Sequence, residues 1–255
     1  MARLKAVLLD LSGVLYVGAE PLPGAQAALA RLTQAGVPVR YITNTTRSTR
    51  ATIHAQLVRM GFTIPEDEIF TAPQAVRRIL RERGLRPYLI VHPGLAPEFA
   101  DLPQADPDAV VLGDAGETFD YAVLNAAFRM LVKGAPLIAM GNNRCFREAE
   151  GLSLDVGPFV AALEYAAGVT AEVLGKPAPE FFHSAVADLG CAPDEVMMIG
   201  DDYAADVEGA LKAGLQATLV RTGKYREGDE ARIGVPGAWL AADIGEAVDR
   251  ILAAR

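Results

Sequence analysis

The fold is indicated by the segment Lys5-Ala6-Val7-Leu8-Leu9-Asp10-Leu11-Ser12-Gly13 near the start of the chain. Residues 5–9 form an apolar run that is too short for a helix and apolar on both faces, which is typical of a buried strand in a parallel sheet. Asp10 follows the run directly. The pattern therefore predicts a buried strand with a carboxylate at its carboxyl end.

Strand-like and helix-like segments alternate on both sides of this run. In the N-terminal part, apolar residues at helical spacing are closed by Gly36 and Gly61, and in the C-terminal part by Gly190 and Gly214. This alternation predicts an α/β fold with a doubly wound, Rossmann-like parallel sheet. The further segments that we expect are helices at 23–35, 48–60, 180–189 and 206–213, and strands at 37–42, 195–199 and 217–220.

The middle of the chain has a pattern of its own, with proline and aspartate clustered at residues 102–108. We interpret it as a smaller α/β cap domain at residues 85–171, inserted into a catalytic core formed by residues 1–84 and 172–255. Within the cap we expect strands at 88–91, 109–112 and 137–140, and helices at 119–132 and 159–167.

The amino-acid composition excludes several kinds of binding partner and metal site. The chain has 255 residues with 24 basic and 32 acidic side chains, a net charge of −8, which argues against nucleic acid or an anionic membrane as the partner. Its two cysteines and three histidines show no zinc-ligand spacing. No charge-free apolar run is long enough for a membrane helix. We therefore expect a cytoplasmic protein.

Polar residues gather where the predicted core strands end or where a core helix begins. In a parallel sheet the strand carboxyl ends share one edge, so clusters far apart in sequence are expected to converge there. The four clusters are Asp10-Leu11-Ser12-Gly13, Thr43-Asn44-Thr45-Thr46, Gly175-Lys176-Pro177, and Gly200-Asp201-Asp202 with Asp206.

Convergence of these clusters would create a site for a phosphorylated ligand. Asp10 and Asp201 would repel each other unless a cation lay between them, and hard oxygen ligands without histidine or thiol favour Mg²⁺. Lys176 would place a positive charge on the other side of a phosphate, and Thr43 and Asn44 would donate hydrogen bonds to it. An aspartate can also act as the nucleophile in phosphoryl transfer.

Together these residues resemble the haloacid dehalogenase-like phosphatase superfamily, whose four motifs are matched in order by Asp10–Leu15, Thr43-Asn44, Lys176 and Gly200–Asp206. The insert between the second and third motifs resembles the large C2 cap of its NagD-like branch. The resemblance extends over essentially the whole chain. Within the branch it is strongest to the group of phosphohistidine and inorganic pyrophosphate phosphatases.

The resemblance implies a role for each motif residue. Asp10 would be the nucleophile, and Mg²⁺ would be held by Asp10, Asp201 and the backbone carbonyl of Ser12. Asp206 would lie just behind these ligands and orient a water molecule. The phosphoryl oxygens would be held by Thr43, Asn44 and Lys176. Relatives with this cap often dimerise through it, so a homodimer is expected as well.

One position departs from the superfamily pattern. Most of its phosphatases carry a second aspartate two residues after the nucleophile, as acid and base, and this chain has Ser12 there. Positioned acid–base catalysis is worth roughly 10²–10⁴ in rate. We therefore expect activity on substrates whose leaving group needs little help from the protein, namely pyrophosphate, aryl phosphates, or a P–N bond whose nitrogen can take a proton from water. The alternative is a catalytically weak protein that binds a phosphorylated ligand or has a regulatory role.

Other functions on an α/β fold are less well supported. A nicotinamide oxidoreductase is disfavoured because no two of the 24 glycines are spaced as Gly-x-Gly.

Asp202 has no assigned role beyond a helix cap or surface residue. In the cap, Asn143, Arg144 and Asp155 are candidates for setting specificity. Arg47 and Arg50 are candidates for attracting an anionic substrate, although a solvated helix face is the favoured interpretation for both.

Overall fold

The computed structural model describes residues 3–148 and 151–254 and divides into two compact units. The first unit comprises Met1–Thr43, Ile53–Phe70 and Lys176–Arg255, and the second comprises Asn44–Thr52 and Thr71–Gly175. The sequence pattern predicts an insert at residues 85–171, whereas the second unit also includes residues 44–52, 71–84 and 172–175.

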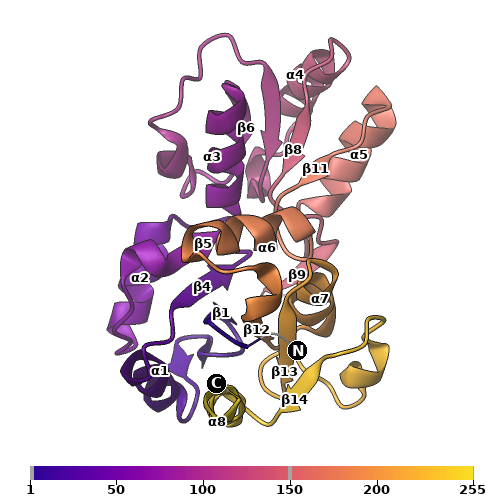
Figure 1. Cartoon of the computed structure of the whole chain (residues 1–255). Helices are drawn as coiled ribbons and strands as arrows, with labels where there is room; N and C mark the ends of the chain where they lie inside the picture. The colour runs from indigo at the N-terminus through magenta and orange to yellow at the C-terminus, as the bar shows by residue number, and fades with distance from the viewer. Residues whose placement is uncertain (1–2, 149–150, 255) are drawn as a thin grey trace. The chain divides into compact units, whose positions relative to one another are not determined.

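The first unit is built on a six-stranded sheet in the order β14-β13-β12-β1-β4-β5 (Figure 1). β1 is buried along its whole length and pairs in parallel with β12 on one side and β4 on the other, with Val7 opposite Met197 and Val39. From β1 the strands that follow first in sequence, β4 and β5, lie on one side, and the later strands β12, β13 and β14 lie on the other. β1 therefore lies where the strand order reverses. In open α/β sheets this is the place where ligands bind. The strands are β1 (Ala6–Asp10), β4 (Val39–Thr43), β5 (Ile69–Thr71), β12 (Val196–Gly200), β13 (Gln216–Val220) and β14 (Trp239–Ala241).

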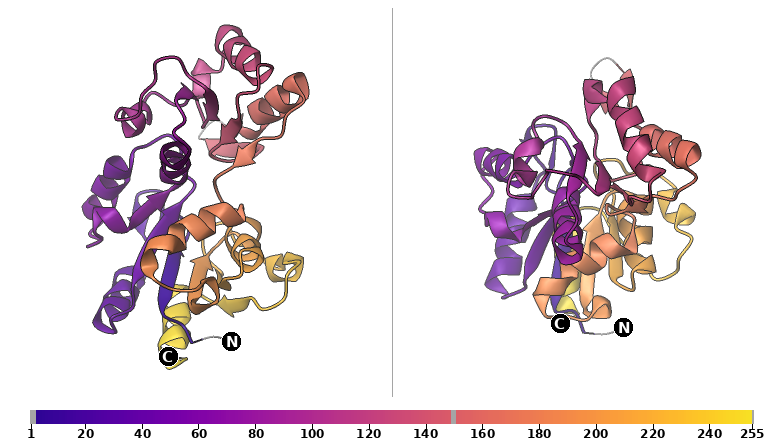
Figure 2. Two further views of the ribbon diagram at one scale, coloured as in Figure 1. Left: turned by 45° about the horizontal axis from the view of Figure 1, so that its top comes forward. Right: turned by 90° about the horizontal axis from the view of Figure 1, so that it is seen from above.

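Helices cover both faces of this sheet. Val7 and Leu9 of β1 point into an apolar cluster with residues of α1, α2 and α8, while α6 and α7 lie on the other side (Figures 1 and 2). These helices are α1 (Ala25–Gln34), α2 (Arg50–Arg59), α6 (Pro179–Val186), α7 (Gly209–Lys212) and α8 (Ile244–Ala253). A π-helical segment, η6 (Tyr203–Glu208), precedes α7, so the helix predicted at 206–213 begins earlier than expected. The predicted fold class, a Rossmann-like α/β core, is confirmed.

The second unit has its own parallel sheet, in the order β11-β8-β7-β6. Residues of β7 and β8, among them Val110, Leu112 and Ala139, pack in an apolar cluster with α4 and α5, which lie side by side (Figure 2). The elements are β6 (Pro87–Ile90), β7 (Ala109–Leu112), β8 (Leu137–Ala139), β11 (Glu172–Val173), α3 (Ala72–Arg83), α4 (Tyr121–Leu131) and α5 (Gly157–Ala167), with an antiparallel hairpin of β9 (Cys145–Glu148) and β10 (Gly151–Leu154).

Short elements complete the chain. β2 and β3 form a small antiparallel pair after β1. Among residues 3–148 and 151–254, no helix is both long and apolar enough to cross a membrane. The remaining elements are β2 (Tyr16–Val17), β3 (Glu20–Pro21), and the 3₁₀ turns η1 (Glu66–Glu68), η2 (Ala96–Phe99), η3 (Gly116–Thr118), η4 (Ala187–Leu189), η5 (Pro193–Glu195) and η7 (Asp229–Arg232).

Candidate active site

Four charged side chains meet at the carboxyl edge of the first unit's sheet. Asp10 is the last residue of β1, Asp201 directly follows β12, and Asp206 lies on η6. Lys176 joins two of them, because its Nζ donates to Asp10 Oδ1 at 2.5 Å and to Asp206 Oδ1 at 2.7 Å. All four residues are less than 10% exposed. The structure therefore brings together four residues that lie up to 196 positions apart (206 − 10).

The three carboxylates form a compact acidic cluster. One oxygen from each of Asp10, Asp201 and Asp206 lies within 4.8 Å of the other two. Fully ionised, they and the Lys176 ammonium carry a charge of −3 + 1 = −2. Buried like charges are unfavourable unless protons or a cation neutralise them. The cluster is thus suited to a divalent cation.

The pKa values of two aspartates reflect this crowding. Burial, followed by the charges of Asp10 and Asp206, raises the pKa of Asp201 to about 7. Burial also raises the pKa of Asp206 to about 6, although Lys176 opposes that rise. Burial alone would lower the pKa of Lys176, but the carboxylates of Asp10 and Asp206 raise it above its usual range. Lys176 is therefore a fixed positive charge at neutral pH.

The aspartates differ in which of their oxygens are already hydrogen-bonded. Asp206 accepts from Lys176 through Oδ1 and from the backbone N–H of Asp202 through Oδ2. Asp201 accepts from the backbone N–H of Lys224 through Oδ2, at 2.7 Å. Its Oδ1 is buried and has no hydrogen-bond partner among the residues that the structure describes. An ionised buried oxygen without a donor is costly, so Asp201 Oδ1 is the atom best suited to a cation.

The donor chemistry fits Mg²⁺. The cluster offers carboxylate oxygens only, which Mg²⁺ prefers over the nitrogen and sulfur donors that favour zinc. Asp10 and Asp201 belong to this cluster, as expected from the sequence. The unpartnered Oδ1 of Asp201 is the structural observation that supports a cation there.

The other predicted residues lie at the same sheet edge or follow it in sequence. Thr43 is buried and ends β4, which is the strand beside β1. Ser12 is exposed in the turn after β1. Asn44, the next residue after Thr43, is half-buried and belongs to the second unit.

Comparisons with known proteins identify the family. A model of haloacid dehalogenase-like hydrolases matches residues 7–102, and a second model of related hydrolases matches residues 173–247. The haloacid dehalogenase-like hydrolase domain-containing protein 2 of Rattus norvegicus is 47% identical, over 98% of this chain and 96% of that protein. The chain belongs to the haloacid dehalogenase-like hydrolase family.

Two more comparisons agree with the resemblance found in the sequence. The phospholysine phosphohistidine inorganic pyrophosphate phosphatase of Xenopus laevis is 44% identical, over 98% of this chain and 96% of that protein. The crystal structure of a 4-nitrophenylphosphatase from Thermotoga maritima has a TM-score of 0.89 at 26% identity and covers 98% of both chains. The predicted enzyme class, a haloacid dehalogenase-like phosphatase, is confirmed.

Sequence reasoning missed two residues at the site of this haloacid dehalogenase-like hydrolase. Thr222 Oγ1 donates to the backbone carbonyl of Gly13, and the backbone N–H of Lys224 donates to Asp201. A signal was present, since both residues lie within four positions of the end of β13, much as the other polar clusters follow their strands. Asp202 caps η6, because its side chain accepts from the backbone N–H groups of Ala204 and Ala205.

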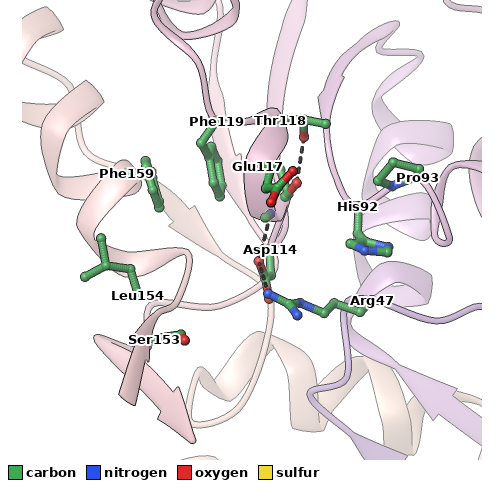
Figure 3. Close-up of a pocket in the computed structure, with 12 residues that line it drawn as sticks. Arg47, His92, Pro93, Asp114, Glu117, Thr118, Phe119, Ser153, Leu154 and Phe159 are labelled. Carbon is green, nitrogen blue, oxygen red and sulfur yellow. Dashed lines mark hydrogen bonds and ion pairs between the residues drawn. The ribbon is translucent and has the colours of Figure 1, made fainter. Parts of the chain in front are cut away.

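The second unit of this family member contains a cavity of about 570 Å³ (Figure 3). On one side Phe119 and Phe159 are stacked, with ring centroids 3.6 Å apart. On the other side lie His92 and Arg47, and Arg47 Nε donates to Asp114 Oδ2 at 2.5 Å. The structure thus places Arg47 in an ion pair that lines this cavity.

The other specificity candidates of the second unit hold a turn together. The backbone carbonyl of Asn143 accepts from Gly157, and that of Arg144 accepts from Asp155. The Asp155 side chain accepts from the backbone N–H of Val156 at 2.7 Å. Burial raises the pKa of Asp155 above its usual value.

Proposed function

We propose that this protein is a Mg²⁺-dependent phosphohydrolase that acts through a phosphorylated aspartate at Asp10. The observation that carries the proposal is the Lys176 ammonium, which is buried and hydrogen-bonded to both Asp10 and Asp206. A fixed cation lies here beside a carboxylate, at the point where the strand order of the α/β sheet reverses. This arrangement is suited to binding a phosphate ester or anhydride.

Within this proposal, Asp10, Asp201 and the backbone carbonyl of Ser12 hold Mg²⁺. The ion would supply positive charge against the phosphoryl oxygens. The unpartnered Oδ1 of Asp201 supports its role as a ligand. Asp206 is already hydrogen-bonded through both oxygens, which supports a role in orienting Lys176 and nearby water over direct binding of the ion.

The substrate's phosphoryl group would be held by Lys176, by the hydroxyl of Thr43 and by the amide of Asn44, the residue that follows Thr43. The Asp10 carboxylate attacks phosphorus, and the bond to the leaving group breaks with its electron pair staying on that group. Water then hydrolyses the acyl phosphate, which releases inorganic phosphate and restores Asp10. Lys176 offsets negative charge on the phosphoryl oxygens in both steps.

Ser12 restricts the leaving group in this proposal. A serine hydroxyl does not donate a proton at neutral pH as a carboxylic acid does, so the leaving group must depart without a positioned acid. Pyrophosphate and aryl phosphates leave as stabilised anions, and the nitrogen of a P–N bond can take its proton from water before the bond breaks. The names of the Xenopus and Thermotoga relatives, which refer to inorganic pyrophosphate, phospholysine, phosphohistidine and 4-nitrophenyl phosphate, support the same substrate class.

The experiment measures phosphate release by the purified protein with Mg²⁺. Pyrophosphate, 4-nitrophenyl phosphate, a phosphoramidate and a sugar phosphate are compared for wild type, Asp10→Asn, and wild type with EDTA. Asp249→Asn is the matched control, because Asp249 is an exposed surface residue paired with Arg31. We expect release from the first three substrates and little from the sugar phosphate, abolished by Asp10→Asn and EDTA and retained in Asp249→Asn. Absence of Asp10-dependent release would favour the phospho-ligand-binding alternative.

We also propose that the protein forms a homodimer through the second unit. The helices α4 and α5 lie side by side, and each carries a tyrosine that is more than 80% exposed, Tyr121 and Tyr165. Exposed tyrosines are enriched at interfaces. Light scattering after gel filtration is expected to give twice the chain mass of 27.0 kDa, and Tyr121→Glu with Tyr165→Glu is expected to halve it. A wild-type mass of one chain at high concentration would contradict the dimer.

A further inference from the structure

The segment Thr222-Gly223-Lys224 makes two hydrogen bonds that the proposed mechanism does not use, one to the turn after β1 and one to Asp201 of the acidic cluster. Thr222 Oγ1 donates to the carbonyl of Gly13 at 2.5 Å, and the backbone N–H of Lys224 donates to Asp201 Oδ2 at 2.7 Å. The segment begins two residues after the last residue of β13. It therefore links the turn after β1 to the aspartate after β12.

Two glycines make this close approach feasible. Gly13 and Gly223 both have positive φ, 91° and 59°. A Cβ at Gly13 would lie 1.9 Å from Asp201 Oδ2, and a Cβ at Gly223 would lie 2.1 Å from the same oxygen and 2.4 Å from the Cα of Gly13. The two backbones thus pack against each other and against one edge of the Asp201 carboxylate, where no side chain fits.

These contacts restrain the rotation of the carboxylate. Oδ2 is held by the Lys224 N–H between the two glycines, whereas Oδ1 is buried without a partner among the described residues. With Oδ2 fixed, the carboxylate of Asp201, which belongs to the cluster with Asp10, is less free to rotate. A metal ligand whose orientation is set by its neighbours binds more tightly than one that is free to rotate.

We propose that Thr222-Gly223-Lys224 is a positioning segment of the metal site, in which Gly223 and the Lys224 N–H set the orientation of Asp201 and Thr222 fixes the turn that carries Ser12 and Gly13. This inference rests on the proposed Mg²⁺ site and extends it to residues outside the four family motifs. It assigns Gly223 and Thr222 an effect on metal affinity although neither offers a carboxylate.

The test measures Mg²⁺ binding by calorimetry on the protein without substrate, so activity is not the readout. Gly223→Ala is compared with Gly190→Ala, because Gly190 has nearly the same φ, 64°, and a Cβ there meets no atom within 4 Å. Both variants therefore carry the same backbone cost, and only Gly223→Ala displaces Asp201. We expect a Kd for Mg²⁺ about 10- to 100-fold higher in Gly223→Ala and within about twofold of wild type in Gly190→Ala.

Thr222 provides a second, milder comparison. Thr222→Val removes the donor to Gly13 and keeps the shape, whereas Thr222→Ser keeps the donor. We expect Thr222→Val to weaken Mg²⁺ binding about two- to tenfold and Thr222→Ser to bind as wild type does. This pair decides the matter if Gly223→Ala does not fold, as judged by circular dichroism in EDTA.

Three outcomes would overturn the proposal. If wild type binds Mg²⁺ and folded Gly223→Ala binds it equally well, the positioning role is wrong and the proposed metal site stands. The same holds if Gly223→Ala does not fold and Thr222→Val binds as Thr222→Ser does. If wild type itself binds no Mg²⁺, the proposed function and this inference both fail.

Discussion

Ser12 is the residue whose replacement should most change which phosphate esters the protein hydrolyses. It lies exposed in the turn after β1, two residues beyond Asp10. An aspartate there would place a carboxylic acid two residues beyond the proposed nucleophile. We expect Ser12→Asp to raise turnover of an alkyl phosphate such as a sugar phosphate by about 10- to 100-fold, below the full 10²–10⁴ of positioned acid–base catalysis. Steady-state kinetics on the sugar phosphate and on 4-nitrophenyl phosphate would measure the change.

Two controls make that result interpretable. Ser12→Asn introduces a side chain of nearly the same size as aspartate, but its amide cannot protonate the leaving group. This variant should therefore leave the rate on the sugar phosphate unchanged. The rate on 4-nitrophenyl phosphate should change little in either variant, because its leaving group needs no acid. A Ser12→Asp enzyme that gains nothing on alkyl esters would contradict the role given to Ser12.

The convergence of Asp10 and Asp201 was predictable because each lies at the carboxyl end of a buried strand. Asp10 and Asp201 come directly after buried apolar runs, and the parallel topology brings such ends together, as the contacts of Lys176 now demonstrate geometrically. The catalytic roles of these residues stay predictions. Thr222 and Lys224 were missed because they act on Gly13 and Asp201 through a backbone carbonyl and a backbone N–H, and residue type does not encode such contacts.

At the scale of an element, the end of β7 depends on one buried carboxylate. Asp114 is 5% exposed and accepts from Arg47 Nε and from the backbone N–H of Gly116. Asp114→Ala removes the buried acceptor of both hydrogen bonds, and the loss of a buried hydrogen-bonding group typically costs about 1–3 kcal/mol. We expect the free energy of unfolding to fall by that amount in urea denaturation. Glu82→Ala, which breaks an exposed pair with Arg78, should change it by less than about 0.5 kcal/mol. Equal effects of the two substitutions would argue against a structural role for Asp114.

Element prediction succeeded where apolar periodicity was strong. The strand predicted at 109–112 coincides with β7, and the helix predicted at 159–167 lies within α5. α3 was not predicted, although Thr71 and Gln74 form a capping box at its start and Gly84 ends it. Its charged arginine-rich surface masks the apolar stripe, and a short segment of β5 precedes it without a clear break. The hairpin of β9 and β10 was also missed, because polar residues interrupt both strands.

At the scale of the whole molecule, the sequence predicts the class of the sheet but not the order of its strands. Alternation of strand and helix predicts a doubly wound parallel sheet, and the structure confirms it. The placement of β1 between β4 and β12 depends on contacts between residues nearly 190 positions apart, such as Ala6 with Val196. Sequence periodicity reports local burial and carries no information on which distant strand pairs with which.

Stability of the whole protein should depend on pH and Mg²⁺ together. In the folded, metal-free protein the pKa values of Asp201 and Asp206 are raised to about 7 and about 6, mainly by burial. Below about pH 3 both are protonated in the folded and unfolded states, so they cost nothing. As pH rises from about 3 to about 8 the unfolded chain ionises first, and these two groups progressively destabilise the fold. Above about pH 8 both are ionised in both states and the cost is constant.

Mg²⁺ should remove this cost only where the carboxylates are ionised, because protons compete for the same oxygens. We expect saturating Mg²⁺ at about 100 times its Kd to stabilise the protein at pH 8 by about 2.7 kcal/mol, a rise in Tm of roughly 5–10 °C for a chain of this size. At pH 5 the rise should be less than half of that. Thermal unfolding at both pH values, with EDTA or Mg²⁺, measures the difference, and Asp201→Asn, which removes one ionising ligand, should abolish most of the shift at pH 8. An equal Mg²⁺ effect at pH 5 and pH 8 would place the ion away from this cluster.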